Sequence, residues 1–274
     1  MFEAILENVS NESPIVHAIT NYVTVNDCAN IILASGGSPI MADNIYEVEE
    51  ITAICHALVI NIGTINDVLV ESMVKAAKKA NEIGHPVILD PVAVGASKLR
   101  TSTVNRLLKE VKFSVIRGNI SEIKAIGLGS GSTKGVDADE ADAVCADNLE
   151  ATIEFARKVS HSTGAVIAIS GAIDIITDDK NTYIIKNGHS LMAKVTGTGC
   201  MLTAVIGSYC GANKDNLLAA TAAAAAAMGL AGELAHAKLL HGGLGTSTYR
   251  TYIIDYMSQM NSSVLNGGIK LESR

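Results

Sequence analysis

The sequence contains no tryptophan, three phenylalanines and four prolines, and charged residues make up only 18% of its 274 positions. Together with a hydrophobic fraction of 48%, this low charge excludes a disordered chain, because a chain of this size can bury most of its apolar surface. The formal net charge is −7 and no block of lysine or arginine is present, so the sequence predicts no nucleic-acid partner. Abundant alanine and glycine instead predict a core of small side chains and closely packed helices.

Long hydrophobic runs are also scarce. The longest apolar stretch, 217–232, is mostly alanine, whereas a membrane-spanning helix needs about 20 strongly apolar residues. We therefore predict a buried helix there and no membrane association. The first residues, Met-Phe-Glu-Ala-Ile-Leu-Glu, carry acids where a secretion signal would be apolar, which predicts a cytoplasmic protein.

The cysteines do not form a recognisable framework. There are five of them, an odd number, with no CxxC pair and no histidine at ligand spacing. This pattern favours neither a disulfide-stabilised fold nor a structural zinc site. Function must therefore be sought in other constellations.

Short apolar runs alternate with amphipathic helical windows along the first two thirds of the chain. The runs have no polar alternation, as expected of strands buried on both faces, and fall at 57–62, 86–90, 113–117 and 165–169. The helices between them are predicted at 66–83, from a cap at Thr101 or Ser102 onward, and at 148–160. This repetition predicts an α/β fold with a parallel sheet between two layers of helices.

The remaining segments complete the prediction. A stretch rich in Gly, Ser and Asp at 127–142 is typical of a surface loop, and the runs 173–177 and 182–186 flank a turn, which predicts antiparallel strands at one edge of the sheet. Three helices are expected, at 199–211, 216–236 and 243–260, followed by a poorly ordered tail from Asn261. With no Pro- or Ser-rich linker and no repeat, residues 1–274 are predicted to form one domain.

The glycine-rich turn 196–200, Thr-Gly-Thr-Gly-Cys, follows a predicted strand and opens an apolar helix. Its backbone amides and the helix N-terminus could bind an anion such as a transferring phosphoryl group, although glycines also serve a tight strand-to-helix turn. It is not a P-loop, because GxxxxGK[ST] is absent. Cys200 lies in the first turn of the helix, where the dipole would lower the thiol pKa and permit a nucleophile or weak base; a buried, inert cysteine is the alternative.

Four other polar residues follow predicted strands, the place where ligands bind in open α/β sheets. Asn119 and Glu122 share one helix face and could serve Mg²⁺, or form a capping box. Arg117 could bind a phosphate or form a surface salt bridge. Asp90 could orient a metal-bound water or a substrate hydroxyl, or simply begin a turn. We expect His17, in an early apolar run, to be a core histidine without a catalytic role.

These motifs together resemble a known family. Arg117-Gly-Asn119-Ile-Ser-Glu122 and Gly197-Thr-Gly-Cys200 resemble the NxxE motif and anion hole of the ribokinase-like superfamily. Further segments, whose order covers residues 14 to 260, resemble the hydroxyethylthiazole kinases; they are His-Ala-Ile-Thr-Asn at 17–21, Val-Asn-Asp-Cys-Ala-Asn at 25–30, Ser-Pro-Ile-Met-Ala at 38–42, Asn-Ile-Gly-Thr at 61–64 and Leu-Asp-Pro-Val-Ala-Val-Gly-Ala at 89–96.

The resemblance implies a ribokinase-like, three-layer α/β/α fold with a mainly parallel sheet and antiparallel edge strands. It implies transfer of the γ-phosphoryl group of ATP, with Mg²⁺, to the primary alcohol of 4-methyl-5-(2-hydroxyethyl)thiazole in thiamine salvage. It also implies a homotrimer with active sites between subunits, in which the segment from Asn21 to Val25 could reach a neighbour's pocket.

Residue roles follow from the same resemblance. It assigns the thiazole to Met41, Gly63, Thr64, Gly197 and Asn21, ATP to Arg117, Ser170 and Asn119, and the metal to Glu122 and Asp90. Phosphoryl transfer itself falls to Gly197, Thr198, Gly199 and Cys200. Ser170 stands where family members often carry threonine, and Cys200 where the superfamily usually has an aspartate base.

Other functions remain open from the sequence. A related kinase could act on hydroxymethylpyrimidine or a sugar instead of the thiazole. A nucleotide-binding module could keep the anion hole without catalysis. A hydrolase using Cys200 as nucleophile would need a histidine base, and none lies near it in the sequence.

Overall fold

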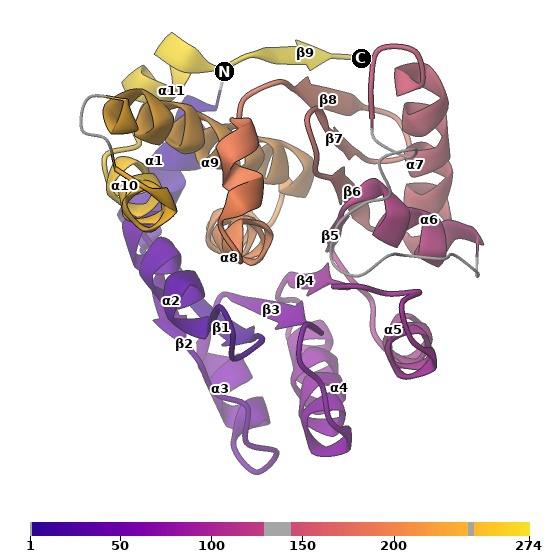
Figure 1. The fold of residues 1–274 in the computed structure, drawn as a ribbon. Coiled ribbons are helices and arrows are strands. Elements are labelled where there is room, and N and C mark those ends of the chain that lie inside the picture. The colour runs from indigo at the N-terminus through magenta and orange to yellow at the C-terminus, as the bar shows by residue number, and fades with distance from the viewer. Residues whose placement is uncertain (1, 129–143, 241–243) are drawn as a thin grey trace.

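A single sheet runs through the described part of the chain, residues 2–128, 144–240 and 244–274 of a computed structural model (Figure 1). Its strands lie in the order β2-β1-β3-β4-β5-β6-β7-β8-β9. The first six in that order are parallel: β2 (Ser38–Ile40), β1 (Ile15–Ile19), β3 (Ala57–Asn61), β4 (Val87–Asp90), β5 (Val115–Gly118) and β6 (Val166–Ile169). Antiparallel strands close one edge: β7 (Asp174–Thr177), β8 (Thr182–Ile185) and β9 (Leu271–Ser273).

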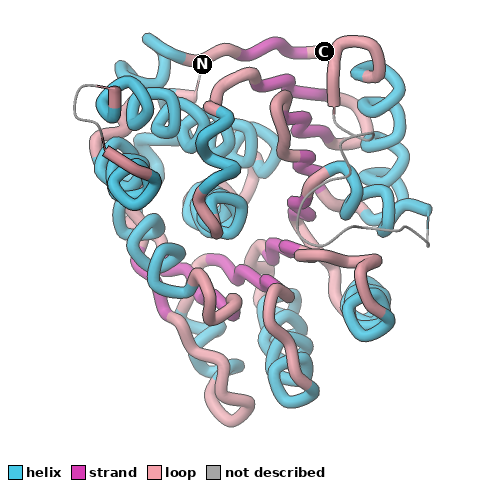
Figure 2. Tube along the Cα trace, viewed as in Figure 1, coloured by secondary structure: helices cyan, strands magenta, loops and turns pink. Residues whose placement is uncertain are grey.

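Helices cover both faces of the sheet, so the molecule has three layers (Figure 2). One face packs against α1 (Glu3–Glu12), α2 (Val25–Ala34), α8 (Thr198–Gly211), α9 (Leu217–Leu239), α10 (Thr246–Ser258) and α11 (Ser262–Gly268). The other packs against α3 (Val48–Ile54), α4 (Asp67–Glu82), α5 (Lys98–Glu110), α6 (Ile120–Leu128) and α7 (Leu149–Thr163).

The two faces of the sheet create two separate apolar cores. Leu58 and Ile60 of β3 pack with the α4 side, whereas Val59 packs with α8 on the opposite side, as the alternation of side chains along a strand requires. Helix α8 approaches the sheet closely, because a Cβ on Gly207 would lie only 2.6 Å from Val59 Cγ2. The small residues of the sequence thus bring the N-terminus of α8 down to the strand ends.

Helix α9 is the alanine-rich segment. By length and composition it could cross a membrane, but 78% of its most apolar window is buried in the molecule. It packs against α8 and α10 (Figure 1), which confirms the predicted buried helix. The helix extends to Leu239, beyond the predicted end.

The predicted three-layer fold is confirmed, including the parallel strands and the antiparallel edge. Three details of the prediction are wrong. The turn at 196–200 does not follow a strand, because a short 3₁₀ helix, Ser190–Lys194, lies directly before it. The tail after Asn261 is not irregular: it forms α11 and β9, which pairs with β8. Helix α5 begins earlier than expected, because the Ser97 hydroxyl accepts the Arg100 backbone N–H and caps it there. Most of the predicted loop at 127–142 lies outside the described residues.

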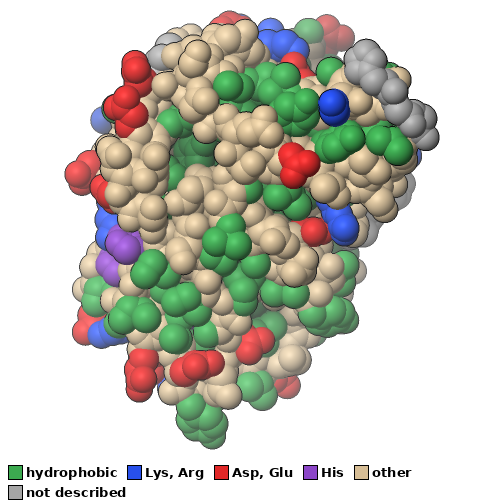
Figure 3. All heavy atoms as spheres, turned by 90° about the vertical axis from the view of Figure 1, so that its left-hand side faces the viewer, with side chains coloured by type: hydrophobic (Ala, Val, Ile, Leu, Met, Phe, Trp, Pro, Cys, Tyr) green, Lys and Arg blue, Asp and Glu red, His purple; other side chains and the backbone are tan. Residues whose placement is uncertain are grey.

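On the face seen in Figure 3, lysine and arginine side chains are scattered singly among acidic ones. Hydrophobic side chains are more frequent in the lower half of this view. No basic stripe crosses this face, in keeping with the net charge of −7.

Candidate active site

Polar side chains form a continuous row along the carboxyl ends of the parallel strands. We call this set the polar row; its members, in the order of the strands, are Asn21, Asn61, Asp90, Arg117 and Ser170. Each member contacts the next through its side chain. Since ligands of open α/β sheets bind beyond these strand ends, the row marks the candidate active site.

Asp90 is at the centre of the row and is completely buried. Its Oδ2 accepts hydrogen bonds from Asn61 Nδ2 at 2.8 Å and Thr203 Oγ1 at 2.9 Å. Its Oδ1 has no hydrogen-bond partner and lies 3.6 Å from Arg117 Nη1. Burial raises the carboxyl pKa despite the opposing effects of Arg117, Thr203 and Asn61, so this oxygen would gain from a cation.

Arg117 spans the gap between Asp90 and the next strand. Its Nη2 donates to Ser170 Oγ at 2.5 Å, and its buried Nε has no partner. The guanidinium also lies against the helix turn: a Cβ on Gly199 would be 2.6 Å from Nη1. The glycine therefore makes room for the guanidinium beside the N-terminus of α8, where both can face one anion.

The other glycine of the turn before α8, Gly197, has a left-handed backbone conformation and lies against Thr24. Gly197 has φ +88°, and a Cβ there would come within 2.5 Å of Thr24 Cγ2. The amides of residues 198–200 precede the first helical bond, Met201 N–H to the Gly197 carbonyl, and so point out of the helix. The Thr198 hydroxyl, by contrast, donates to the Met192 carbonyl. The backbone of this turn, and not the threonine hydroxyl, is available to an anion.

Cys200 lies at the other side of the row. Its Sγ accepts hydrogen bonds from Asn21 Nδ2 at 3.3 Å and Asn61 Nδ2 at 3.2 Å. The expectation that the helix dipole lowers the thiol pKa is wrong: burial and the charge of Asp90 raise it, although the Thr24 hydroxyl, Arg117 and Asn21 act in the opposite direction. Burial dominates because the sulfur is enclosed by the polar row and the apolar core.

Asn119 and Glu122 form the reciprocal cap that was the alternative to a metal site. The Asn119 N–H donates to Glu122 Oε2 at 2.8 Å, and the Glu122 N–H to Asn119 Oδ1 at 2.9 Å. Glu122 Oε1 accepts the N–H of Ala93, a non-glycine residue in the left-handed region at φ +57°. Burial and the nearby Asp90 raise the pKa of Glu122 to about 7. Capping does not preclude a water-mediated role toward a cation.

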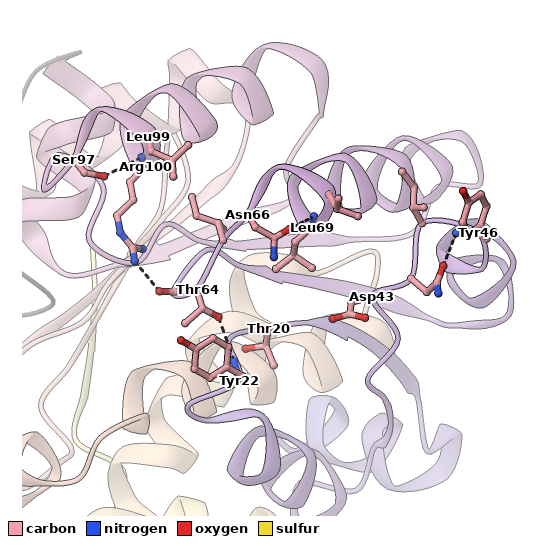
Figure 4. Close-up of a pocket in the computed structure, with 15 residues that line it drawn as sticks. Thr20, Tyr22, Asp43, Tyr46, Thr64, Asn66, Leu69, Ser97, Leu99 and Arg100 are labelled. Carbon is pink, nitrogen blue, oxygen red and sulfur yellow. Dashed lines mark hydrogen bonds between the residues drawn. The ribbon is translucent and has the colours of Figure 1, made fainter.

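A groove of about 860 Å³ lies beside the row (Figure 4). Gly63 and Thr64 line it, as does Arg100, whose guanidinium donates to the carbonyls of Ile62 and Gly63 at 2.7 Å and thereby fixes the loop after β3. Met41 does not line this groove; it packs, partly buried, against the same apolar cluster as Cys200.

Two polar residues at the candidate site, Asn61 and Asp174, were assigned no role from the sequence. Asn61 ends β3 and joins Asp90 to Cys200, and a polar residue ending an otherwise apolar strand was the available signal. Asp174, at the start of β7, is buried near Arg117 and accepts the Gly171 N–H at 2.8 Å. Nothing local in the sequence distinguished it from a turn residue.

His17 fits the core role predicted for it. Its ring is fully buried, with Nε2 2.7 Å from the Ala42 carbonyl and Nδ1 2.9 Å from Thr52 Oγ1. Desolvation lowers its pKa. The side chain links β1 to α3 and to the loop after β2 and lies outside the polar row.

Comparison with known proteins agrees with this geometry. A model of the hydroxyethylthiazole kinase family matches residues 6–263. The chain belongs to this family. It is 57% identical, over the full length of both chains, to a hydroxyethylthiazole kinase of Clostridium acetobutylicum. The resemblance seen in the sequence is thereby confirmed.

Solved structures of other proteins have the same fold. A hydroxyethylthiazole kinase from Pyrococcus horikoshii OT3 superimposes with a TM-score of 0.87 at 32% identity, covering 100% of this chain and 98% of that one. A ribokinase-like superfamily protein of Enterococcus faecalis, at 12% identity, covers 93% of this chain and 94% of its own with a TM-score of 0.62, which supports the fold alone.

The burial of Asp174 generates a pH prediction. Burial raises its pKa from 3.8 to about 7, so between these values the folded protein binds more protons than the unfolded chain, and stability falls as the pH rises. Asp174→Asn removes this contribution while keeping an acceptor for Gly171. We expect the free energy of unfolding of the variant to decline ~1–3 kcal/mol less than that of the wild type between pH 4 and pH 8.

Urea unfolding at several pH values measures this difference. Asp179→Asn, in the exposed turn after β7, is the control and should keep the slope of the wild type. Glu122, which also has a raised pKa, contributes equally to all three proteins. Parallel curves for the wild type and Asp174→Asn would contradict the assignment.

Proposed function

We propose that the chain phosphorylates the primary alcohol of 4-methyl-5-(2-hydroxyethyl)thiazole with ATP, using the polar row and the N-terminus of α8. The observation that carries this proposal is the convergence of Arg117, the amides of residues 198–200 and the unpartnered Asp90 Oδ1 at one point. Such a point suits a group that carries negative charge and a cation together, as a transferring phosphoryl group does. Family membership specifies the thiazole alcohol as acceptor.

In this proposal ATP binds beyond the ends of β5 and β6. Arg117 donates to its phosphates, aided by the free Nε proton. Ser170 holds the guanidinium in place and supplies a hydroxyl, and Asn119 begins the helix on the same side. The transferring phosphoryl group faces the amides of Thr198, Gly199 and Cys200, which stabilise its developing charge.

The residues present fit a Mg²⁺ ion bound together with ATP. The described residues contain no cluster of three or more metal-ligating side chains, but Mg²⁺ on a nucleotide needs only one or two carboxylates besides phosphate and water. Asp90 Oδ1, buried and without a hydrogen-bond partner, is the natural ligand, and Glu122 would act through water. When bound, the ion would neutralise charge on the phosphates and favour the ionised form of both carboxyls.

The thiazole alcohol is proposed to lie between Cys200 and the loop after β3. Met41, Gly63, Thr64 and Gly197 would surround the ring, while Asn21 acts through its hydrogen bond to Cys200. Because phosphoryl transfer passes through a loose transition state that needs no strong base, Cys200 needs only to orient the hydroxyl. No histidine contacts Cys200 among the hydrogen bonds of the described residues, which disfavours the hydrolase alternative.

The experiment for this function is ADP formation from Mg-ATP with hydroxyethylthiazole, compared with hydroxymethylpyrimidine, ribose and no acceptor. We expect ADP formation only with the thiazole. ADP formation with another acceptor would keep phosphoryl transfer but reject the thiazole pocket. Folded protein that is inactive with every acceptor would instead favour a nucleotide-binding module.

Replacement of Cys200 tests its role. Asn21 and Asn61 donate to its sulfur, and the same donors suit a carboxylate. We therefore expect Cys200→Asp to retain activity within about threefold, and Cys200→Ala to lower kcat about tenfold. This loss is smaller than the roughly 10²–10⁴-fold typical of a general base, because the thiol mainly orients the hydroxyl. Steady-state kinetics on proteins of equal thermal stability decide the matter, and an inactive but folded Cys200→Asp would reject this role.

We further propose a homotrimer with active sites at the subunit contacts. Large hydrophobic side chains are unusually exposed around the groove: Tyr22 is 78%, Val68 64% and Tyr46 90% accessible to solvent. Figure 4 shows Tyr22 beside Thr64 and Tyr46 at the opposite end of the groove. Exposed hydrophobic side chains along the same groove support an interface that covers the thiazole pocket.

Introducing negative charge on this surface provides the test. Tyr46→Glu combined with Val68→Glu should convert a trimer to monomers, because each buried glutamate would lack a partner. Light scattering measures the mass of the particle. Leu240→Glu, at an equally exposed leucine on the end of α9, should leave the mass unchanged. A wild-type monomer, or a trimer that survives the double change, would argue against this interface.

The proposal also includes the domain organisation and the cellular location. Residues 1–274 act as one domain, supported by the continuous sheet from β2 to β9. The protein works in the cytoplasm, supported by five cysteines that are all free thiols.

A further inference from the structure

Asn61 is the residue of the polar row that contacts both Asp90 and Cys200. It is the last residue of β3, pairs in register with Asp90 on β4, and is 1% exposed. Its Oδ1 accepts from the Gly63 N–H at 2.8 Å and from Asn21 Nδ2 at 3.0 Å. Its Nδ2 donates to Asp90 Oδ2 at 2.8 Å and to Cys200 Sγ at 3.2 Å.

These four bonds use the whole capacity of a carboxamide, which has two N–H donors and an oxygen with two lone pairs. They also determine which way the amide points. The Gly63 backbone N–H can only donate, so the atom facing it must be the oxygen. The NH₂ group must then face Asp90 and Cys200; the opposite orientation would place two oxygens 2.8 Å apart.

The same geometry restricts the thiol of Cys200. Its sulfur receives two N–H groups, from Asn61 and from Asn21. Asn21 is itself held, because its Oδ1 accepts from both the N–H and the hydroxyl of Thr24. A sulfur enclosed by two donors cannot direct its own proton toward them. The S–H must point away from the row. When that proton leaves, the negative charge of the thiolate is met by two fixed N–H dipoles.

We propose that Asn61 is a positioning residue for phosphoryl transfer: its single NH₂ group aims Cys200 Sγ at the acceptor hydroxyl and holds Asp90 so that Oδ1 alone faces the phosphates. The inference rests on the proposed role of Cys200. In addition, one amide, that of Asn61, holds both the Cys200 sulfur and the Asp90 carboxylate in position. Asn61 does not contact the reacting groups itself.

The competing explanation is structural. The amide could merely join the ends of β3 and β4, as Asn81 joins α4 to Lys112 through a bond in each direction, both at 2.8 Å. A structural link would change stability, and through it activity, independently of what stands at position 200. A positioning role predicts instead that the effect depends on the sulfur.

A double-mutant cycle on kcat separates the two explanations. We expect Asn61→Ala to lower kcat about tenfold with Cys200 present, and less than about threefold in a Cys200→Ala background, where only the bond to Asp90 is left to lose. The KM values for thiazole and ATP should change less than about threefold. In a Cys200→Asp background, where a carboxylate accepts the same N–H, the tenfold effect of Asn61→Ala should return. Equal losses in all three backgrounds would overturn the proposal.

A second measurement does not depend on turnover. The rate of iodoacetamide labelling at Cys200, followed by peptide mass spectrometry at constant pH, should fall at least threefold in Asn61→Ala, because the forming thiolate loses a donor. An unchanged or faster rate would overturn the proposal. Asn81→Ala is the matched control and should alter neither kcat nor labelling. If Asn61→Ala does not fold, Asn61→Ser, which is too short to reach the sulfur, replaces it in both experiments.

These outcomes are distinct from a failure of the proposed function. A wild-type protein that forms no ADP with the thiazole would reject the kinase proposal, while the labelling experiment would still test Asn61. If Cys200→Ala kept the kcat of the wild type, the role of Cys200 and this inference would both be rejected, with the kinase activity intact.

Discussion

The structure depends on burying one carboxylate, Asp90, at the centre of a parallel sheet. A buried charge without partners is strongly unfavourable, so the neighbouring strand ends must supply donors. Asn61 and Thr203 satisfy Oδ2, and Arg117 lies near Oδ1. Oδ1 has no hydrogen bond and is offset only by the Arg117 charge, so it could accept a further positive group. The requirement for stability and the capacity to bind a charged ligand therefore have the same origin.

The packing of α8 makes this arrangement possible. Gly207 brings the helix close to Val59, and the glycines at 197 and 199 let its N-terminus meet Thr24 and the Arg117 guanidinium. Larger residues at these positions would lift the helix from the strand ends and separate its amides from the polar row. Small residues, which give little hydrophobic stabilisation themselves, thus decide how the proposed anion site is assembled.

Local patterns in the sequence predicted much of this protein, but some side chains required the fold. The apolar strands, the helix after Gly197 and the hairpin around residues 178–181 follow from periodicity and turn residues, and the structure confirms them. The spacing of Asn119 and Glu122 fitted both a metal site and a helix cap, and the structure contains the cap. The pKa of Cys200 was predicted in the wrong direction, because burial depends on neighbours that are remote in sequence.

The sequence by itself determined the fold class, the family and the set of polar residue types at the strand ends, since these are properties of local order and spacing. Only the tertiary structure decided which polar groups contact one another. Asn61 and Cys200 are 139 positions apart in the sequence, and no periodic pattern could connect residues at that distance. Their contact exists because parallel strands end at one side of the sheet and α8 begins there, so the hydrogen bonds at the site are set by topology.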